Sequence, residues 1–399
     1  MVLSKDKEKH LSYLSRFYQN SIENDFLVFW NKALDKKNGG VFTCYTNRGD
    51  HLISKDKYIW SQGRFMWIWA HVIELAQNNL LNIDPKPYAE HLEKTTHFIE
   101  KNAFLPNGNT IFLLSADGKP KETVKGKGYD TSFYADCFVI IGFVACGRIL
   151  NKEYWIQKAL TIYDNVRSRL DQNNVRSEPY PIPIGFKAFA FSMIMLNVSQ
   201  ELAEALKTTG HPRFREIEEN ARDYLNIILK EFHTSAGRTI ELLTEHESLK
   251  KSLLYRQMTP GHSIECLWFL LHTAKVLHIN ILESVEKIMS YAWKTGWDVQ
   301  YGGLLRCVDF EGGKPKGSLL NNSFEKLIRQ TWDSKLWWPH SELLYTTMLL
   351  WFYTHNEKYW DMYQQAHDYV FSTFPNPDKK TGEWIQIRDR QGKPMDKQV

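Results

Sequence analysis

Three segments of the sequence place aromatic, charged and proton-transferring side chains at helical spacing. They read KYIWSQGRFMW from Lys57, PGHSIECLW from Pro260 and KLWWPHSE from Lys335. In the second segment His262 and Glu265 lie three positions apart after a helix-opening Pro-Gly, so they share one helical face. A carboxylate within reach of an imidazole fixes its tautomer and raises its basicity, as a proton-abstracting histidine needs. A satisfied surface or core pair would have the same spacing, so the interpretation also depends on the other two segments.

Arg64 lies early in the first segment and faces the same way as Trp60 and Trp67. We expect its guanidinium to be buried among these rings. A buried guanidinium needs an acceptor, which is either a substrate oxygen or a carboxylate of the protein such as Glu342. The sequence therefore leaves a substrate contact and a structural ion pair as alternatives for Arg64.

The third segment surrounds a proline with Trp338, His340 and Glu342. Proline is common in the first turn of a helix, and a tryptophan at this place can simply belong to the core. The functional alternative is that Glu342 and Trp338 point into a cavity. An aromatic content of 14%, with 14 Trp, suits carbohydrate, because the apolar faces of a sugar ring pack on aromatic rings. An aromatic core alone would also explain that composition.

The spacing of apolar residues predicts a helical scaffold for these segments. Helical periodicity covers residues 5–33, 60–80, 86–103, 131–150, 153–170, 186–208, 212–232, 261–278, 282–297, 338–354 and 357–373. Between the helices, alternating apolar residues run into NRG, DG, EGG or QG turns, which indicates β-hairpins. These hairpins begin near Gly39, Asn109, Gly237, Gly302 and Gly382, and a Pro-rich connection near residue 176 fills the remaining gap.

The hairpins recur with a period of about 65–70 residues, so six units of outer helix, hairpin or loop, and inner helix fit the chain. Six helix pairs closed into a ring form an all-α (α/α)6 barrel, a toroid, which we expect to be a single domain over residues 1–399. Such a ring needs twelve helices, and eleven are predicted because the sixth hairpin is followed at once by Val399. We therefore expect that the last inner helix is missing and that the natural chain continues. An open solenoid is the alternative architecture.

Composition narrows the class of protein. Lys and Arg total 50 against 46 Asp and Glu, and the signs are interspersed, so we expect no nucleic-acid partner. No apolar run is long enough for a membrane span and no signal segment follows Met1, which predicts a cytoplasmic protein without a membrane partner. The 5 Cys lack paired spacing, so we expect neither disulfides nor a metal site.

Together the three segments resemble the N-acylglucosamine 2-epimerase family. KYIWSQGRFMW resembles its first inner-helix motif, PGHSIECLWFLL its Pro-Gly-His-x-x-Glu helix, and KLWWPHSELL its Trp-Trp-Pro-His-x-Glu helix. SFYADCFVIIGF from Ser132 and KAFAFSMIMLN from Lys187 are similar to weaker family segments. The resemblance covers essentially the whole chain and implies the (α/α)6 barrel. The sequence Trp-Trp-Pro-His-Ser-Glu resembles the N-acyl-hexosamine branch of the family more than the cellobiose branch.

The resemblance implies an isomerase that interconverts N-acetyl-D-glucosamine and N-acetyl-D-mannosamine. A base removes the C2 proton of the open-chain sugar, and an acid on the other face returns it, through an enediolate. The resemblance assigns His262 as one acid–base group with Glu265 as its orienting partner, and Arg64 as the donor to the enediolate oxygen. The hydroxyls and ring of the sugar would be held by Glu342, Trp338, Tyr134, Lys187 and His340.

The resemblance implies no metal or redox cofactor. It includes ATP as an activator that is not consumed, although the GxxxxGK[ST] pattern is absent, and it leaves a homodimer open. The second catalytic histidine of the family follows the hairpin that here reads GEWIQIRDRQGKPMDKQV, where this chain ends. The alternatives are an epimerase or isomerase of cellobiose or mannose, an inverting glycosidase with Glu265 and Glu342 as its carboxylates, and a sugar-binding homologue without catalysis.

Overall fold

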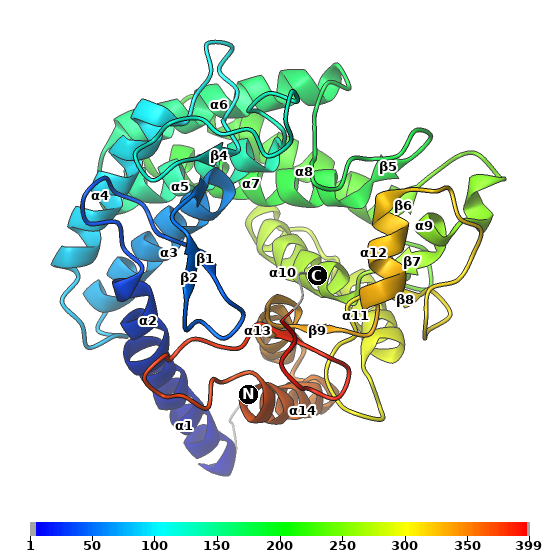
Figure 1. The fold of residues 1–399 in the computed structure, drawn as a ribbon. Coiled ribbons are helices and arrows are strands. Elements are labelled where there is room, and N and C mark those ends of the chain that lie inside the picture. Colours follow the sequence, from blue (N-terminus) through cyan, green and yellow to red (C-terminus); the bar gives the residue numbers. More distant parts are fainter. Residues whose placement is uncertain (1–4, 397–399) are drawn as a thin grey trace. The chain divides into compact units, whose positions relative to one another are not determined.

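The computed structural model describes residues 5–396, which form long helices joined by short strands (Figure 1). All of the predicted helices are present. They are α1 (Lys5–Ser21), continued through a π-helical turn (Ile22–Phe26) into α2 (Leu27–Lys32), then α3 (Ile59–Gln77), α4 (Lys86–Asn102), α5 (Tyr134–Ile149), α6 (Glu153–Asp171), α7 (Phe189–Thr208), α8 (Phe214–Glu231), α10 (Pro260–Leu277), α11 (Leu282–Gly296), α13 (Trp337–Thr354) and α14 (Glu357–Thr373). The predicted twelfth inner helix lies outside the described residues.

Three short helical segments were not predicted. They are a 3-10 turn (Leu249–Lys251), α9 (Leu253–Arg256) and α12 (Ser323–Thr331). The start of α12 carries a recognisable signal, because Asn322 and Glu325 form a reciprocal capping box. The helix itself is only 9 residues long, which is too short for apolar periodicity to stand out.

The contacts of the chain divide it into two compact units. The first comprises the residues up to Arg176 together with Asn376–Glu383, and the second comprises Ser177–Pro375 and the residues from Trp384 on. In the first unit α3 packs against α4 and α5, and α5 also packs against α6; in the second, α10 packs against α7, α8, α11 and α13. The single domain over residues 1–399 stays a prediction.

Two-residue strands precede most inner helices and pair with a later hairpin. The pairs are antiparallel: β3 (Lys57–Tyr58) with β4 (Leu113–Leu114), β5 (Lys187–Ala188) with β6 (Leu242–Leu243), β7 (Gln257–Met258) with β8 (Val308–Asp309), and β9 (Lys335–Leu336) with β10 (Ile387–Arg388). A further pair, β1 (Cys44–Tyr45) with β2 (Leu52–Ser54), is formed inside the first predicted hairpin. Each strand before an inner helix, which we call a lead-in strand, is thus bonded to the hairpin of the next repeat.

Two lead-in strands are anchored by buried lysines, one in each unit. The Lys57 ammonium donates to the Asp35 carboxylate at 2.7 Å and to the carbonyl oxygen of Gly39, also at 2.7 Å. Lys335 repeats the arrangement in the second unit, with the Asp298 carboxylate at 3.3 Å and the Gly302 carbonyl as its acceptors. Burial lowers the pKa of both lysines, and the paired carboxylates oppose that change. These pairs fix where the following inner helices begin.

The inner helices approach closely where glycine removes the side chain. In the first unit a Cβ on Gly63 of α3 would lie 2.4 Å from the backbone of Phe138 in α5, and one on Gly142 would lie 2.7 Å from the Gly63 carbonyl oxygen. The α5 helix is buried on all sides between Ala135 and Gly147. Apart from Asp136, the sequence of this stretch is almost wholly apolar, and its place between other helices explains this.

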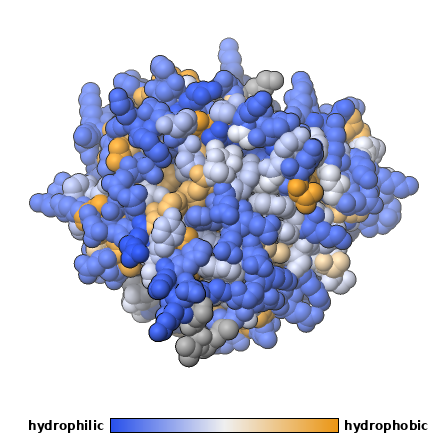
Figure 2. Space-filling view, turned by 90° about the horizontal axis from the view of Figure 1, so that it is seen from below, coloured by the Kyte–Doolittle hydropathy of each residue, from blue (hydrophilic) through white to orange (hydrophobic). Residues whose placement is uncertain are grey.

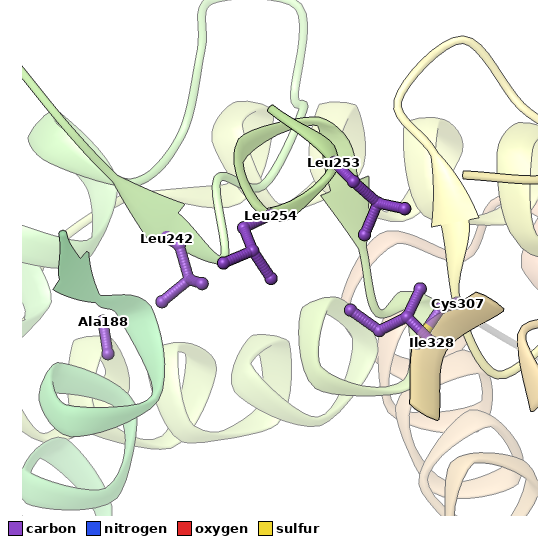
Figure 3. Close-up of a cluster of buried hydrophobic side chains, with 6 residues drawn as sticks. All are labelled: Ala188, Leu242, Leu253, Leu254, Cys307 and Ile328. Atoms are coloured by element: carbon purple, nitrogen blue, oxygen red, sulfur yellow. The ribbon is translucent and has the colours of Figure 1, made fainter. Parts of the chain in front are cut away.

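The hairpins have a core of their own. In the second unit, side chains from β5, β6, α9, α12 and the residue just before β8 form the buried cluster of Figure 3, namely Ala188, Leu242, Leu253, Leu254, Cys307 and Ile328. Figure 2 shows a face on which hydrophobic residues occur in small groups among hydrophilic ones. Within residues 5–396 there is no helix with the length and hydropathy of a membrane span.

Candidate active site

The candidate site of the second unit is built on the N-terminal turn of α10. Thr259 is in extended conformation, and Pro260 occupies the first helical position, where its missing N–H removes no helical hydrogen bond. The pairing of Met258 with Val308 holds the lead-in strand in place. His262 is therefore presented at the start of a helix whose origin is fixed by a strand pair.

A buried carboxylate from the preceding hairpin binds His262. Glu241 is 7% exposed, and its Oε2 lies 3.1 Å from His262 Nδ1. Its other oxygen accepts the backbone N–H of Thr259, also at 3.1 Å. Because a carboxylate oxygen only accepts hydrogen bonds, Nδ1 carries the hydrogen and Nε2 carries the lone pair. Glu241 thus fixes both the helix start and the tautomer of a histidine that can act as a base at Nε2.

The charges around His262 raise its pKa. Burial alone would lower the pKa of this imidazole, but the charge and hydrogen bond of Glu241 outweigh burial, and the charge of Glu265 acts in the same direction. Arg306 opposes them. The partner of Nδ1 is therefore Glu241, and Glu265, which the sequence assigned to that role, acts on His262 through its charge.

Trp338 from α13 lies against His262. The two ring centroids are 5.3 Å apart and the ring planes are inclined by 31°. A Cβ on Gly261 would lie 2.8 Å from Pro339 Cβ and 2.9 Å from the Trp338 ring, so only glycine permits this approach of α10 and α13. The Pro-Gly before His262 thus opens the helix and also brings an aromatic ring to the catalytic candidate.

Glu342 is oriented by a tryptophan one turn further along the same helix pair. Trp268 Nε1 donates to Glu342 Oε2 at 2.7 Å. Next to this pair the Tyr345 hydroxyl lies 3.0 Å from His272 Nε2. His262 and Glu265 on α10 and Trp338 and Glu342 on α13 therefore lie on two helices that pack against each other.

His340 is not able to bind substrate in the way that the sequence suggested. It is fully buried, its Nε2 accepts the backbone N–H of Leu304 at 2.8 Å, and its Nδ1 lies 2.6 Å from the Leu336 carbonyl. Burial lowers the pKa of His340 to about 3. Both ring nitrogens are therefore used by the backbone, and His340 is a neutral structural residue.

Arg64 and Tyr134 belong to the first unit. Arg64 is exposed, contrary to the expectation that it is buried, and its guanidinium carbon lies 4.3 Å from the centre of the Phe138 ring. The Trp60 ring, which stacks on Phe138, lies 5.4 Å from Tyr134. Of the two aromatic neighbours that were predicted, Trp60 lies near the guanidinium, at 5.7 Å, and Phe138 is a neighbour that was not predicted.

Lys187 lies in the second unit, on the lead-in strand of α7. Its side chain is 54% exposed and its ammonium lies 2.5 Å from the Glu231 carboxylate. The lead-in position is the one that Lys57 and Lys335 occupy in other repeats, but those two lysines are buried. Lys187 therefore remains accessible to a ligand while it is held by one ion pair.

Glu241 is the functional residue that sequence reasoning missed. It lies 21 positions before His262, in the stretch TIELL, so helical spacing could not connect the two. A charged residue between apolar neighbours in a predicted strand was the available signal, since such a residue is rarely buried without a partner. In residues 5–396 no group of three or more His, Cys, Asp or Glu side chains is arranged to hold a metal ion.

Comparisons with known proteins identify the family of this chain. The model of the N-acylglucosamine 2-epimerase (GlcNAc 2-epimerase) family matches residues 40–399. N-acylglucosamine 2-epimerase of Bos taurus is 25% identical over 377 residues, covering 92% of this chain and 82% of the bovine protein.

Two solved structures share the fold. Cellobiose 2-epimerase from Bacillus thermoamylovorans B4167 superposes with a TM-score of 0.76 at 14% identity, covering 96% of this chain and 94% of that chain. A D-mannose isomerase superposes with a TM-score of 0.74 at 17% identity, covering 96% and 92%. Cellobiose 2-epimerases have an (α/α)6 barrel, so the predicted fold class is confirmed. The chain belongs to the N-acylglucosamine 2-epimerase family, a family of carbohydrate 2-epimerases.

Proposed function

We propose that this protein interconverts N-acetyl-D-glucosamine and N-acetyl-D-mannosamine by moving the proton on C2. The observation that carries the proposal is the Glu241–His262 pair, which leaves Nε2 of a half-exposed histidine with a lone pair. The relatives that bear the name N-acylglucosamine 2-epimerase support the choice of substrate. A raised pKa suits the role, because a more basic imidazole accepts the C2 proton more readily.

In the proposed reaction the sugar is in its open-chain form. His262 Nε2 takes the proton from C2, the electrons of that bond form a C1–C2 double bond, and the aldehyde oxygen becomes an enolate oxygen. Because C2 carries the N-acetyl group in these sugars, the intermediate is an enolate and not the enediolate of a sugar with a hydroxyl on C2. An acid on the opposite face then protonates C2 with inverted configuration. His340 does not supply that acid, because its ring is fully buried and bonded to backbone groups.

The other site residues would hold the sugar. Trp338 offers a ring face beside His262, and Glu342, oriented by Trp268, offers a carboxylate for hydroxyl groups. Arg64 would donate to the enolate oxygen, and Tyr134 and Lys187 would bind hydroxyls. The proposed reaction requires no metal or redox cofactor. We propose that the protein acts in cytoplasmic amino-sugar metabolism. ATP would be an activator that is not consumed, and the assembly would be a homodimer.

Proton NMR in D2O with a panel of free sugars tests the function. We expect deuterium at C2 of N-acetyl-D-glucosamine and of N-acetyl-D-mannosamine, with each sugar giving rise to the other. Exchange in cellobiose or mannose alone would assign a different substrate. Release of reducing sugar from a disaccharide without C2 exchange would replace the epimerase by a glycosidase, and binding without either reaction would indicate a sugar-binding homologue.

A further inference from the structure

Arg306 occupies an additional position in its hairpin. In the other hairpins that pair with a lead-in strand, three positions separate an isolated bridge residue from the first residue of the strand. These are Thr110 and Leu113, Thr239 and Leu242, and Trp384 and Ile387. In the hairpin of Arg306 the bridge residue is Leu304 and β8 begins at Val308, so four positions separate them and this hairpin holds one more residue than the others. The regular strand pairing therefore does not dictate where the Arg306 side chain goes.

The backbone on both sides of Arg306 is firmly held. Its N–H donates to the Ser334 carbonyl at 3.0 Å, and the N–H of Cys307 donates to the Trp332 carbonyl, also at 3.0 Å. The guanidinium Nη1 donates to the hydroxyl of Thr331 at the end of α12. The half-buried side chain is thus positioned by the turn that leads into α13.

The charge of Arg306 has no carboxylate partner among residues 5–396. Arg256, one strand away, shows the usual arrangement, because its guanidinium binds both Asp309 oxygens, at 2.7 and 3.0 Å, and also Glu311. A half-buried guanidinium without a carboxylate is available for an anionic ligand.

The hairpin of Arg306 lies against the start of α10. Val308 pairs with Met258, and Cys307 Sγ lies 3.9 Å from the hydroxyl of Thr259, whose backbone N–H binds Glu241. The electrostatic effect of Arg306 on His262 is consistent with this proximity. A positive charge beside a base disfavours the protonated base but favours an anion formed next to it.

We propose that Arg306 is a further catalytic residue, whose guanidinium donates to the C1 oxygen as that oxygen becomes negatively charged. The inference rests on the proposed function and deepens it. When the C2–H bond breaks, the proton goes to His262 Nε2 and the electron pair becomes the C1–C2 double bond, so the C1 oxygen gains the charge that Arg306 stabilises. Arg306 would act in addition to Arg64.

The first test compares the kinetics of Arg306→Gln with those of Arg329→Gln, a control that removes an exposed positive charge from α12. We expect Arg306→Gln to lower kcat for C2 exchange about 100-fold with little change in KM, as the loss of one donor to a developing oxyanion does. Arg306→Lys should recover part of the loss, and the control should match the wild type. A normal kcat in Arg306→Gln would overturn the proposal.

The second test measures binding by calorimetry. N-acetylglucosaminate carries a carboxylate at C1 and mimics the enolate charge, whereas N-acetylglucosaminitol is neutral there. We expect the wild type to bind the carboxylate more tightly and Arg306→Gln to lose that preference while it still binds the alcohol. Equal loss of both ligands would show a purely structural role and would overturn the proposal. If the wild type exchanges no C2 proton, the proposed function fails, and this comparison still decides whether Arg306 binds an anionic oxygen.

Discussion

His262 and His340 stand at the same register of neighbouring repeats, each four positions after the end of a lead-in strand, yet their environments are opposite. His340 is fully buried and its pKa is lowered to about 3 by burial, whereas His262 is 32% exposed and its pKa is raised by Glu241 against the effect of burial. The partner of each ring explains the contrast. Backbone groups use both nitrogens of His340, while a side-chain carboxylate uses only one nitrogen of His262.

Gln62 in the first unit stands at the same position relative to its lead-in strand and has a structural role there. Its amide accepts the N–H of Val41 at 2.8 Å and donates to the carbonyl of the same residue at 2.9 Å. Gln62 and His340 thus each tie an inner helix to the hairpin that precedes it. At His262 the carboxylate of Glu241 replaces the backbone as partner, and a structural position becomes one that can transfer a proton.

The largest effect is expected from His262→Gln. Removing the acid–base group should lower C2 exchange about 1000-fold, while the melting temperature and circular dichroism stay close to those of the wild type. Near-normal exchange in this variant would show that another group is the base. The matched variant His340→Gln should retain exchange, and this difference is the direct test of the comparison.

Glu241→Gln should have the next largest effect. Above the pKa of His262 we expect exchange to fall by at most about 10-fold for each pKa unit that His262 loses, and we expect the acidic limb of the kcat/KM profile to move to lower pH. The direction of this shift follows from the raised pKa of His262. The neutral imidazole is lost as pH falls through that pKa, and the variant lowers the pKa because it removes the charge of Glu241. Glu265→Gln should shift the limb in the same direction but less. If the acidic limb stayed unchanged in Glu241→Gln, the hydrogen bond from His262 to Glu241 would not be the cause of the raised pKa of His262.

Gly261→Ala tests the approach of α13 to the site. The new methyl would meet Pro339 and Trp338 below 3.0 Å, so we expect a loss of about 1–3 kcal/mol in the free energy of unfolding. The displaced Trp338 ring should raise KM for the sugar more than it lowers kcat. Denaturant unfolding and steady-state kinetics measure the two effects, and a variant with wild-type stability would mean that the helices separate without strain.

His340→Gln should have the smallest effect, a loss of about 1 kcal/mol in stability, because glutamine can span the same backbone groups as Gln62 does. The stability that a buried neutral His340 contributes is present above pH 6.5 and is lost as pH falls toward about 3. The variant should therefore lose stability less steeply on acidification, as followed by urea unfolding at several pH values. His262 has the opposite sign, since its raised pKa adds stability below pH 6.5.

The sequence was sufficient for the long helices, though not for α9, α12 and the 3-10 turn, and for the residues that share a helix, such as His262 with Glu265. Local periodicity determines both, so neither required knowledge of the fold. Glu241 and Arg306 could not be found in this way, because their places depend on which hairpin follows which strand. The burial of His340 and the exposure of Arg64 were predicted wrongly for a related reason, since a motif specifies residue types but the packing of neighbouring elements decides exposure.

The pairing of lead-in strands with later hairpins also determines how the site opens to solvent. The amides at the start of α10 are protected by β8 and by Glu241, which come from two different hairpins. Hydrogen–deuterium exchange at Met258 therefore requires fluctuation of β8, about 50 residues later in the chain, and exchange at Thr259 requires release of its N–H by Glu241, rather than fraying of the helix itself. Mass spectrometry should find peptides containing Met258 and Val308 exchanging together, and a ligand held by Arg306 should slow both.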